Sequence, residues 1–438
     1  MKYSRVGLVT ACGLCLPFLL AMTALVNGQP QVERVIEVAP RCPGTRSQTW
    51  ASLAWSPQSQ CWLVAWREGY LNEEVSDIWC ARISADGKAL DPAGIRITSG
   101  PGLKDKPQVA SDGTDFMVVW EDLRNGRDWD VYAARVTAQG KVLDANGFVV
   151  AAGQHNQCRP DVGFAAGFYL VVWQEFVGDG TPNTPGNAYV VRGNRISSNG
   201  KPADDQPIEI ARIEKESHAL NPVLACQEST ALVGFTVRAF ASGNDYFARR
   251  PIDVASGRVL GPTPEPSRNS AKPPIHLPAS EGEAPRRDVL AINKAGAVTV
   301  LHDKVHGAQV WKMAADGKDP QLVARLAAPN KQSRTDTSYP VCRALASDGN
   351  TFLLLAEWPQ LRQDGRVRMQ VRGWRLGPDA KPQDDADTGF ILAADERRDQ
   401  LSPAVAAGPQ VIFLAVWSER RGPDDIKVVA RRVLLDVK

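Results

Sequence analysis

A short apolar motif that ends in tryptophan and a carboxylate recurs along this chain of 438 residues. The clearest copies read CWLVAWRE at 61–68, FMVVWED at 116–122, YLVVWQE at 169–175 and FLAVWSE at 413–419. Weaker copies read ALVGFT at 231–236, AVTVLHD at 297–303 and FLLLAEW at 352–358. An internal repeat with a period of roughly 50–60 residues predicts a repeat architecture in which each copy forms one structural unit.

Each copy has similar flanking sequence. Upstream lies a short segment that often contains proline and ends in a turn, as in PQVASDG at 107–113. Downstream comes DVYAARV at 130–136, a glycine turn, and then GFVVAAG at 147–153. The alternation of apolar and polar residues and the turn residues between the segments are typical of β-strands. Four antiparallel strands per repeat predict an all-β fold, a single seven-bladed β-propeller of four-stranded blades.

The two ends of the chain predict how the ring closes. We expect the propeller to span 29–438, with blades starting near 50, 107, 160, 222, 288, 340 and 403. The last repeat ends after its third strand, and ERVIEVAP at 33–40 reads as an isolated fourth strand. Pairing this N-terminal strand with the C-terminal blade would close the ring and cover an edge that otherwise promotes aggregation.

The polar residues of the motif recur together with its apolar residues. The tryptophans are Trp66, Trp120, Trp173 and Trp417, and a carboxylate follows each of them two positions later. An arginine recurs in the third segment, as Arg82, Arg135, Arg195, Arg375 and Arg432. A catalytic group is needed once per protein, whereas an ion pair that holds a blade together is needed in every blade. We therefore interpret the tryptophans and arginines as structural repeat residues. In the weaker copies, Phe235, His302 and Trp358 are the expected counterparts of the tryptophan.

These motifs resemble those of a group of secreted bacterial β-propeller repeat proteins, in which P-x-V-A, L-V-V-W-x-D and D-[IV]-x-A-x-R-[VI] follow one another. The match is clearest at 107–147 and includes Pro107, Trp120, Asp130, Arg135 and Asp144. The fourth and fifth repeats depart from the pattern. The resemblance implies the propeller fold and export, and it does not imply a reaction.

The first 28 residues predict an export signal. Lys2 and Arg5 precede an uncharged apolar run, and Val26-Asn27-Gly28 supplies small residues for cleavage. An uncleaved membrane anchor is the alternative interpretation. We expect a secreted, periplasmic or cell-surface protein. The formal net charge of the chain is +2, and loss of Lys2 and Arg5 would leave none. A neutral chain argues against a nucleic-acid partner.

The cysteines outside the signal are even in number. They are Cys42, Cys61, Cys80, Cys158, Cys226 and Cys342. An even set in an exported protein predicts disulfides, although their pairing is not determined by the sequence. No C-x-x-C pair occurs among them, which argues against a zinc cluster.

One face of the predicted propeller is the expected location of a site. The loops between strands two and three and those between strand four and the next blade share this face, and loops on a rigid scaffold commonly bind ligands. They include the long loop at 175–188 and a proline-rich insertion at 261–287. The candidate ligand-binding residues expected there are His155, His218, His276, His302, His306, Asp303, Glu175 and Asp179.

The histidines of this face have two interpretations. They could form a metal or acid–base site over blades three to five. The simpler interpretation is that histidines are common in polar loops, and that His302 is a packing residue of a degenerate repeat. We predict no cofactor, although the carboxylates of the same loops would suit calcium and the histidines a transition metal. No D-x-D-x-D-G loop and no catalytic motif is present.

Two functions remain open on the sequence alone. We favour an exported, monomeric and non-catalytic scaffold that binds a glycan, peptide or protein on its loop-rich face. The alternative is a carbohydrate-active enzyme, either a glycoside hydrolase or a metal-dependent polysaccharide lyase, with a site over blades three to five. Regular repeats without a unique catalytic constellation favour the scaffold.

Overall fold

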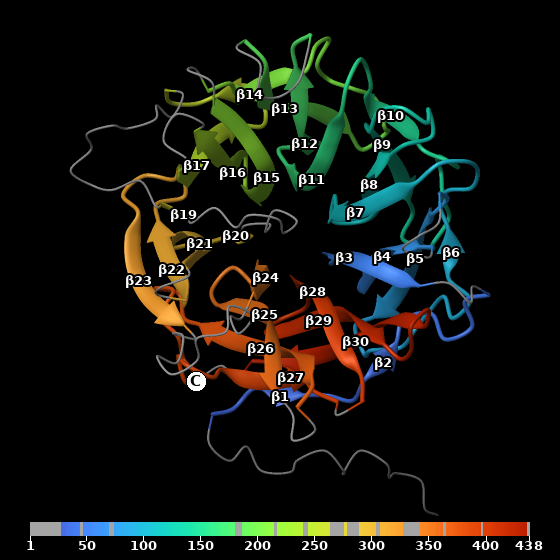
Figure 1. Ribbon diagram of the computed structural model, residues 1–438, viewed down its shortest axis with the longest axis vertical. Helices are drawn as coiled ribbons and strands as arrows, with labels where there is room; N and C mark the ends of the chain where they lie inside the picture. Colours follow the sequence, from blue (N-terminus) through green and yellow to red (C-terminus); the bar gives the residue numbers. More distant parts are fainter. Residues whose placement is uncertain are drawn as a thin grey trace, which may run out of the picture.

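The computed structural model shows a ring of seven antiparallel sheets arranged as a β-propeller (Figure 1). It describes residues 28–43, 47–69, 74–179, 186–213, 217–239, 244–262, 276–277, 289–303, 307–326, 341–361, 365–395 and 397–435. The described residues form strands, turns and loops and contain no helix. The predicted all-β, seven-bladed propeller is therefore confirmed. The predicted export signal lies outside the described residues, apart from Gly28.

The first three blades follow the chain in order. Blade 1 contains β3 (Gln48–Ser56), β4 (Cys61–Glu68), β5 (Asp77–Ser84) and β6 (Ile95–Arg96). Blade 2 contains β7 (Lys104–Ser111), β8 (Phe116–Asp122), β9 (Asp130–Val136) and β10 (Phe148–Ala151). Blade 3 contains β11 (Gln157–Ala165), β12 (Phe168–Val177), β13 (Ala188–Ser197) and β14 (Ile208–Ala211). In each, the first strand lies nearest the centre of the ring and the fourth lies at its rim (Figure 1).

The next three blades keep this order. Blade 4 contains β15 (Ser217–Gln227), β16 (Thr230–Ala239), β17 (Asn244–Asp253) and β18 (Arg258–Val259), and β19 (His276–Leu277) adds a further strand to β17. Blade 5 contains β20 (Val289–Asn293), β21 (Gly296–Asp303), β22 (Gly307–Met313) and β23 (Gln321–Leu326). Blade 6 contains β24 (Val341–Ser347), β25 (Phe352–Leu361), β26 (Val367–Leu376) and β27 (Phe390–Ala393).

Blade 7 joins the two ends of the chain. It contains β28 (Asp399–Ala407), β29 (Ile412–Arg420) and β30 (Ile426–Leu434), and its rim strand comes from β1 (Gln31–Val32) and β2 (Ile36–Glu37). Gln31 pairs with Leu434 and Ile36 with Ala430. An ion pair of 3.0 Å between Arg432 and Glu33 reinforces this closure. The predicted pairing of the N-terminal strand with the C-terminal blade is confirmed.

We call the two ends of the propeller upper and lower. The upper end carries the connections from strand two to strand three of a blade and from strand four to the next blade. The lower end carries the other two kinds of turn. Among the described residues, no helix is long and apolar enough to cross a membrane.

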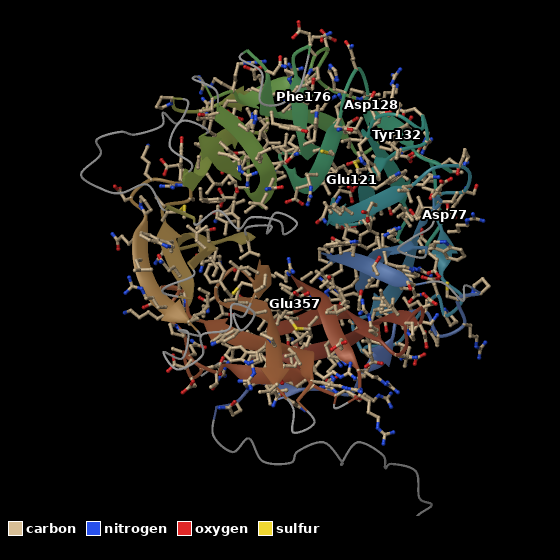
Figure 2. The ribbon with its side chains drawn as sticks, viewed as in Figure 1. Asp77, Glu121, Asp128, Tyr132, Phe176 and Glu357 are labelled. Atoms are coloured by element: carbon tan, nitrogen blue, oxygen red, sulfur yellow. The ribbon has the colours of Figure 1, made fainter. Side chains whose placement is uncertain are left out.

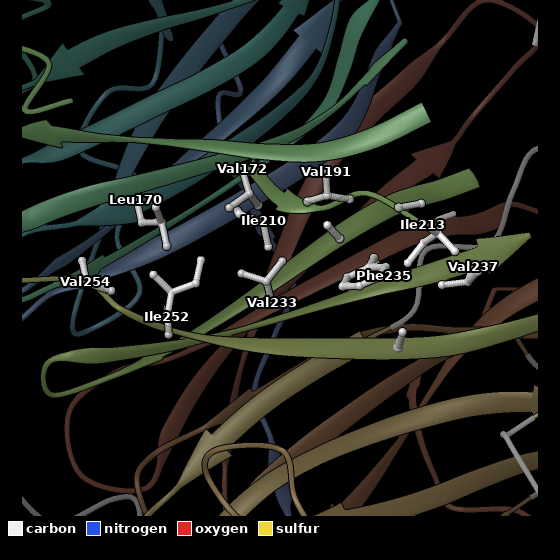
Figure 3. Close-up of a cluster of buried hydrophobic side chains, with 14 of the residues drawn as sticks. Leu170, Val172, Val191, Ile210, Ile213, Val233, Phe235, Val237, Ile252 and Val254 are labelled. Atoms are coloured by element: carbon white, nitrogen blue, oxygen red, sulfur yellow. The ribbon is translucent and has the colours of Figure 1, made fainter. Parts of the chain in front are cut away.

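Apolar side chains fill the space between neighbouring sheets. Figure 3 shows such a cluster between blades 3 and 4, where Leu170, Val172 and Ile210 of blade 3 meet Val233 and Phe235 of blade 4. Phe235 is fully buried, which stabilises the fold by about 1.5–3 kcal/mol for a side chain of this size. Because each sheet packs on both neighbours, its two faces are both apolar, as the sequence motif LVVW shows for strand two.

The strand register corrects two positions of the predicted repeat. In blade 2, Trp120 pairs with Tyr132 of β9, and Tyr132 precedes the bulge toward the rim strand. The residues at the same register are Thr299 in blade 5 and Ala356 in blade 6. His302 and Trp358 therefore do not replace the tryptophan, because each lies further along its strand, toward the upper end. The expectation failed because matching letters cannot reveal an offset between degenerate strands.

Candidate ligand-binding ring

Two of the predicted site residues, His155 and His218, lie in a row of aromatic rings where blades 3 and 4 meet. The His155 ring packs edge-on against Phe176 at 5.1 Å, and its Nε2 lies 2.9 Å from the Gly178 carbonyl oxygen. Tyr189 lies 5.3 Å from Phe176 and 5.5 Å from the His218 ring. Figure 2 labels Phe176 within blade 3. The structure thus connects His155, which precedes β11 of blade 3, with His218 in β15 of blade 4, at opposite ends of this row.

His218 and Glu175 have internal bonding partners. The backbone N–H of Tyr189 donates to His218 Nδ1 at 3.0 Å, and the histidine is only 3% exposed. Glu175 accepts a hydrogen bond from the Trp173 indole at 3.2 Å and forms an ion pair of 3.4 Å with Arg192. Glu175 therefore holds blade 3 together, and His218 joins blade 4 to blade 3. Asp179 is exposed, and its backbone N–H donates to the Asn187 side chain at 3.2 Å.

The other predicted site residues are described only in part. His276 lies in β19 opposite Tyr246, and His302 and Asp303 end β21. The structure describes the backbone of these three residues and not their side chains, and His306 lies outside the described residues. Within the part of the chain that is described, no group of three or more histidines, cysteines or acids could hold a metal ion.

The repeated tryptophans are buried in the interior of their blades. Trp66, Trp120, Trp173 and Trp417 are at most 1% exposed. The indole of Trp66 donates to Glu68 at 2.9 Å, and that of Trp120 donates to Asp122 at 2.8 Å. In blade 7 the acceptor is Gln400 instead, since Glu419 binds Arg398 and Arg421. The carboxylate after the tryptophan thus satisfies an indole N–H that would otherwise be buried without a partner in blades 1 to 3.

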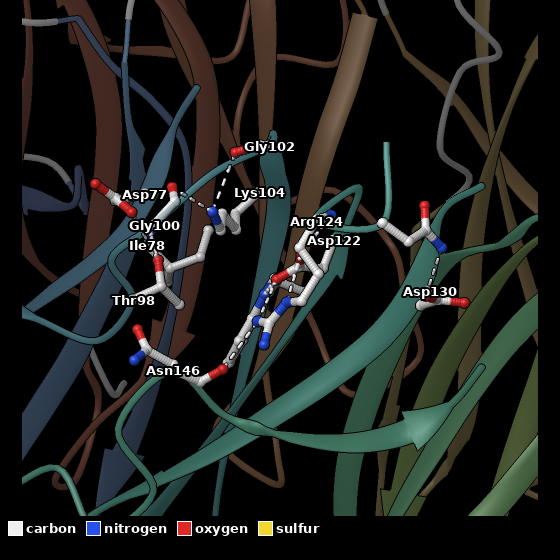
Figure 4. A network of polar contacts seen from close by, with 12 residues as sticks. Asp77, Ile78, Thr98, Gly100, Gly102, Lys104, Asp122, Arg124, Asp130 and Asn146 are labelled. Atoms are coloured by element: carbon white, nitrogen blue, oxygen red, sulfur yellow. Dashed lines mark hydrogen bonds and ion pairs between the residues drawn. The ribbon is translucent and has the colours of Figure 1, made fainter. Parts of the chain in front are cut away.

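A buried polar network surrounds Asp122 and Lys104 at the upper end of blade 2 (Figure 4). Arg124 binds both oxygens of Asp122, and its guanidinium lies 3.8 Å from the centre of the Tyr132 ring. The Lys104 ammonium is enclosed by the carbonyl oxygens of Gly100, Pro101 and Gly102, at 2.9, 2.6 and 3.1 Å. Burial lowers the pKa of Lys104. This network fixes the connection between blades 1 and 2.

The repeated arginines form staples at the lower end. Arg82, Arg135, Arg195 and Arg375 each bind an aspartate nine residues later, with Nε or Nη to carboxylate distances of 2.6–2.8 Å. These aspartates are Asp91, Asp144, Asp204 and Asp384. The acid partner is therefore in the turn after strand three and is not the carboxylate that follows the tryptophan.

The staples also connect neighbouring blades. The guanidinium of Arg82 donates to the carbonyl of Ala138 in blade 2 at 2.7 Å, and that of Arg195 donates to Ala255 in blade 4 at 2.5 Å. Gly140, with a φ of +82°, leaves room for this contact, since a Cβ there would lie 3.0 Å from Arg82 Nε. One arginine thus joins its own turn and the turn of the next blade.

A different repeated feature occurs on the inner strands near the upper end. Trp50, Lys106, Arg159, Asn221 and Ser402, which we call the inner ring, have φ values between 49° and 57°. Each is the first residue of a β-bulge in β3, β7, β11, β15 or β28. Left-handed backbone is uncommon for residues other than glycine and is concentrated at functional sites. A proline follows four of the five, because a bulge does not require its N–H.

Three of the bulges, those at Arg159, Asn221 and Ser402, bind the preceding blade through the side chain after the tryptophan position. Glu121 accepts a hydrogen bond from the Arg159 N–H at 2.9 Å, Gln174 accepts from the Asn221 N–H at 2.8 Å, and Glu357 accepts from the Ser402 N–H at 2.5 Å. Figure 2 labels Glu121 and Glu357 toward the middle of the ring. The backbone at these three positions is therefore held by the preceding blade, and their side chains are not needed for this contact.

The inner ring is polar and aromatic over blades 1 to 3. Trp50 is 38% exposed. The Lys106 ammonium forms ion pairs with Glu121 and, at 3.7 Å, with Asp105, and lies 5.9 Å from the centre of the Trp129 ring. Arg159 is half-buried. Burial raises the pKa of the Asp105 carboxyl, which Lys106 opposes. An aromatic surface beside ammonium and guanidinium groups can bind a ligand that has both apolar and polar faces.

The inner ring was not among the predicted site residues. Its signal was the residue before the repeated proline, in Lys106-Pro107, Arg159-Pro160, Asn221-Pro222 and Ser402-Pro403. The same position of the repeat carries a different residue type in each of these copies. Strand propensity places the prolines at the start of the inner strands, yet β7 begins at Lys104 and β11 at Gln157, so the prolines lie inside the strands, at the bulges.

The expected disulfides are not formed. No disulfide joins any of Cys42, Cys61, Cys80, Cys158, Cys226 and Cys342, all of which are described by the structure. Cys61 and Cys80 lie on neighbouring strands but pair with Ser84 and Ala65, so their register keeps them apart. Burial raises the pKa of Cys158, Cys226 and Cys342 to about 12, which keeps these thiols protonated and unreactive.

Comparisons with known proteins establish the fold alone. No protein-family model and no curated protein matches the chain. A crystal structure of a protein of unknown function from Dyadobacter fermentans is similar over 94% of this chain and 100% of its own, with a TM-score of 0.51 and 11% identity. The polysaccharide lyase Uly1 is similar over 92% of this chain and 100% of its own, with a TM-score of 0.52 and 10% identity.

Proposed function

We propose that this protein is an exported β-propeller that binds a glycan at the inner ring of blades 1 to 3. The observation that carries the proposal is the placement of Trp50, Lys106 and Arg159 at the same bulge of three successive inner strands. The bulges give these three residues the same left-handed backbone, so their side chains leave equivalent positions near the upper end. Export rests on the apolar N-terminal segment of the sequence.

The chemistry of these side chains favours a glycan over a peptide or protein. The C–H face of a pyranose packs on an aromatic ring, and its hydroxyl groups bond to planar or charged side chains. Trp50 on β3 supplies the ring, and Lys106 on β7 and Arg159 on β11 supply donors on the next two inner strands. A protein partner would require a larger apolar surface in the same place, whereas the described residues next to Trp50 on β3, Thr49 and Ala51, are partly or fully buried. That the lyase Uly1 adopts this type of fold supports a carbohydrate ligand only through the shared architecture.

Isothermal titration of the mature protein against neutral and acidic polysaccharides tests the proposal. We expect Trp50→Ala to weaken the binding of any ligand found by about tenfold or more, because an aromatic surface is lost. Trp311→Ala is the matched control, since Trp311 lies in blade 5 and its indole donates to Gln309. Equal binding by wild type and Trp50→Ala, or no binding to any polysaccharide, would overturn the proposal.

A further inference from the structure

Arg159 differs from two other cations that lie in inner-strand bulges next to a glutamate, Lys106 and Arg343. In blade 6, the guanidinium of Arg343 donates to Glu357 from Nε at 3.0 Å and from Nη2 at 2.9 Å. In blade 3, no ion pair or hydrogen bond of the Arg159 guanidinium is found among the described residues. Arg343 is therefore neutralised within the scaffold, and Arg159 is not neutralised by the described residues.

The reason lies in how Glu121 is used. One of its oxygens binds the Lys106 ammonium, and the other accepts the Arg159 backbone N–H at 2.9 Å. Glu121 is 1% exposed, so no further cation can reach it from solvent. Lys106 in turn contacts two carboxylates, those of Glu121 and Asp105. The charge of Lys106 is thus compensated locally, whereas that of Arg159 is left for an external anion.

We propose that the glycan is anionic and that its acid group binds the Arg159 guanidinium while a sugar ring packs on Trp50. This inference rests on the proposed function. A guanidinium bonds a carboxylate or a sulfate through two parallel N–H donors, which an uncharged hydroxyl cannot match. Because β7 lies between β3 and β11, the ligand spans three inner strands and is an oligosaccharide or polysaccharide rather than a single sugar.

The test compares matched acidic and neutral polymers at low ionic strength. The probes are polygalacturonate and its methyl ester, and dextran sulfate and dextran, titrated into the full mature chain. We expect at least one acidic polymer to bind about tenfold or more tightly than its neutral counterpart, with an affinity that falls as salt is added. Preference for polygalacturonate identifies a carboxylate as the acid group, and preference for dextran sulfate identifies a sulfate.

Arg159→Gln separates this inference from the proposed function. We expect this variant to lose about tenfold in affinity for the acidic polymer and to bind neutral polymers as wild type does. Lys141→Ala is the matched control, because it removes an exposed positive charge from a lower-end turn. Equal binding of acidic and neutral polymers that still depends on Trp50 would overturn the anionic ligand and leave glycan binding intact. Full acidic affinity in Arg159→Gln would also overturn it, and binding of none of the four polymers would overturn both proposals. Thermal unfolding confirms that each variant is folded.

Discussion

The lower-end staples and the inner ring both recur from blade to blade. The staples repeat a pair of side chains, whereas the inner ring repeats a backbone conformation. At the staples the side chains are the same in each case, with arginine bound to an aspartate nine residues later. At the inner ring the backbone is the same, with a left-handed residue in a bulge, while the side chain changes from tryptophan to lysine, arginine, asparagine and serine. The staples make their contacts through side chains, whereas Arg159, Asn221 and Ser402 of the ring contact the preceding blade through backbone N–H groups.

This difference indicates what each position contributes. A contact made by a side chain restricts that side chain, so the staple residues recur. A contact made by the backbone leaves the side chain available, so the inner ring can carry a ligand site without weakening the scaffold. In a repeat protein, a constant backbone with variable side chains is therefore a better guide to a site than a constant side chain. Breaking each region should affect different properties.

The largest effect is expected at a staple. Asp144→Asn should lower the free energy of unfolding by about 2 kcal/mol at pH 7, because it removes the charged acceptor of Arg135. Burial tends to raise the pKa of Asp144, but the bonds and charge of Arg135 lower it overall. The stability from this ionised carboxylate is present above the unfolded pKa of about 3.9 and is lost as the pH falls through the folded value.

Denaturant unfolding at several pH values measures this effect. The difference between wild type and Asp144→Asn should shrink below pH of about 4. Asp86→Asn is the control, since Asp86 occupies a lower-end turn but is largely exposed. Glycan affinity of Asp144→Asn should equal that of wild type, and a loss of affinity would contradict the separation of the two regions.

A pair of glutamates should give the next largest effect. Glu121→Ala and Glu357→Ala each remove an acceptor for the next inner strand, and each should destabilise the fold by about 1.5–2 kcal/mol. Only Glu121→Ala should also weaken glycan binding, because Glu121 positions both Lys106 and Arg159. Chemical denaturation and titration calorimetry on the two variants check this. Equal loss of affinity in both would show that the ligand site is not confined to blades 1 to 3.

The contribution of Asp105 to stability should change with pH in the opposite direction to that of Asp144. Burial raises its pKa, so its ionisation in the folded protein opposes folding. The favourable contribution of its neutral form is complete below the unfolded pKa of about 3.9 and is lost as the pH rises through the folded value. Asp105→Asn should therefore raise the free energy of unfolding by about 1 kcal/mol at pH 7, with no gain near pH of about 3. A loss of stability at pH 7 would mean that its ion pair with Lys106 outweighs burial.

The smallest effect is expected from a change within the inner ring itself. Ser402→Arg should alter the free energy of unfolding by less than about 0.5 kcal/mol, because the bulge binds Glu357 through its backbone N–H. Arg135→Ser at a staple is the matched comparison and should cost several times more. Thermal unfolding of both variants measures the contrast. A large loss in Ser402→Arg would show that the ring positions are restricted after all.

Much of the architecture was predictable because it repeats. Period, alternation and turn residues indicated seven blades, and the isolated strand at 33–40 indicated the closure that the pairing of Ile36 with Ala430 confirms. The repeat did not indicate that His302 and Trp358 are displaced along their strands from the tryptophan position. Degenerate sequences can be aligned by residue type at the wrong strand register. The expectation of disulfides also failed, because even numbers of cysteines carry no information on their spacing in the folded protein.

The candidate site was less accessible to the sequence. The histidines and acids of the upper loops were predicted as site residues from their residue type. His155 packs against Phe176 and His218 packs against Tyr189, where blades 3 and 4 meet. Trp50, Lys106 and Arg159 lie far apart in the chain, differ in side-chain chemistry and belong to no common sequence motif. The backbone conformation that unites them appears only when strands one and two are paired and the bulge becomes visible.

The local pattern of residues was sufficient to predict the fold class, the number of blades and the way the ring closes. Strand alternation, turn residues and the repeat period can all be read over short stretches of the chain. The partners of the charged groups depended on tertiary structure. Arg343 meets Glu357, whereas Glu121, at the same register in another blade, is occupied by Lys106 and the Arg159 N–H. Which guanidinium is neutralised and which is left for a ligand depends on competition for the same carboxylate oxygens, and that competition exists only once neighbouring blades are packed together.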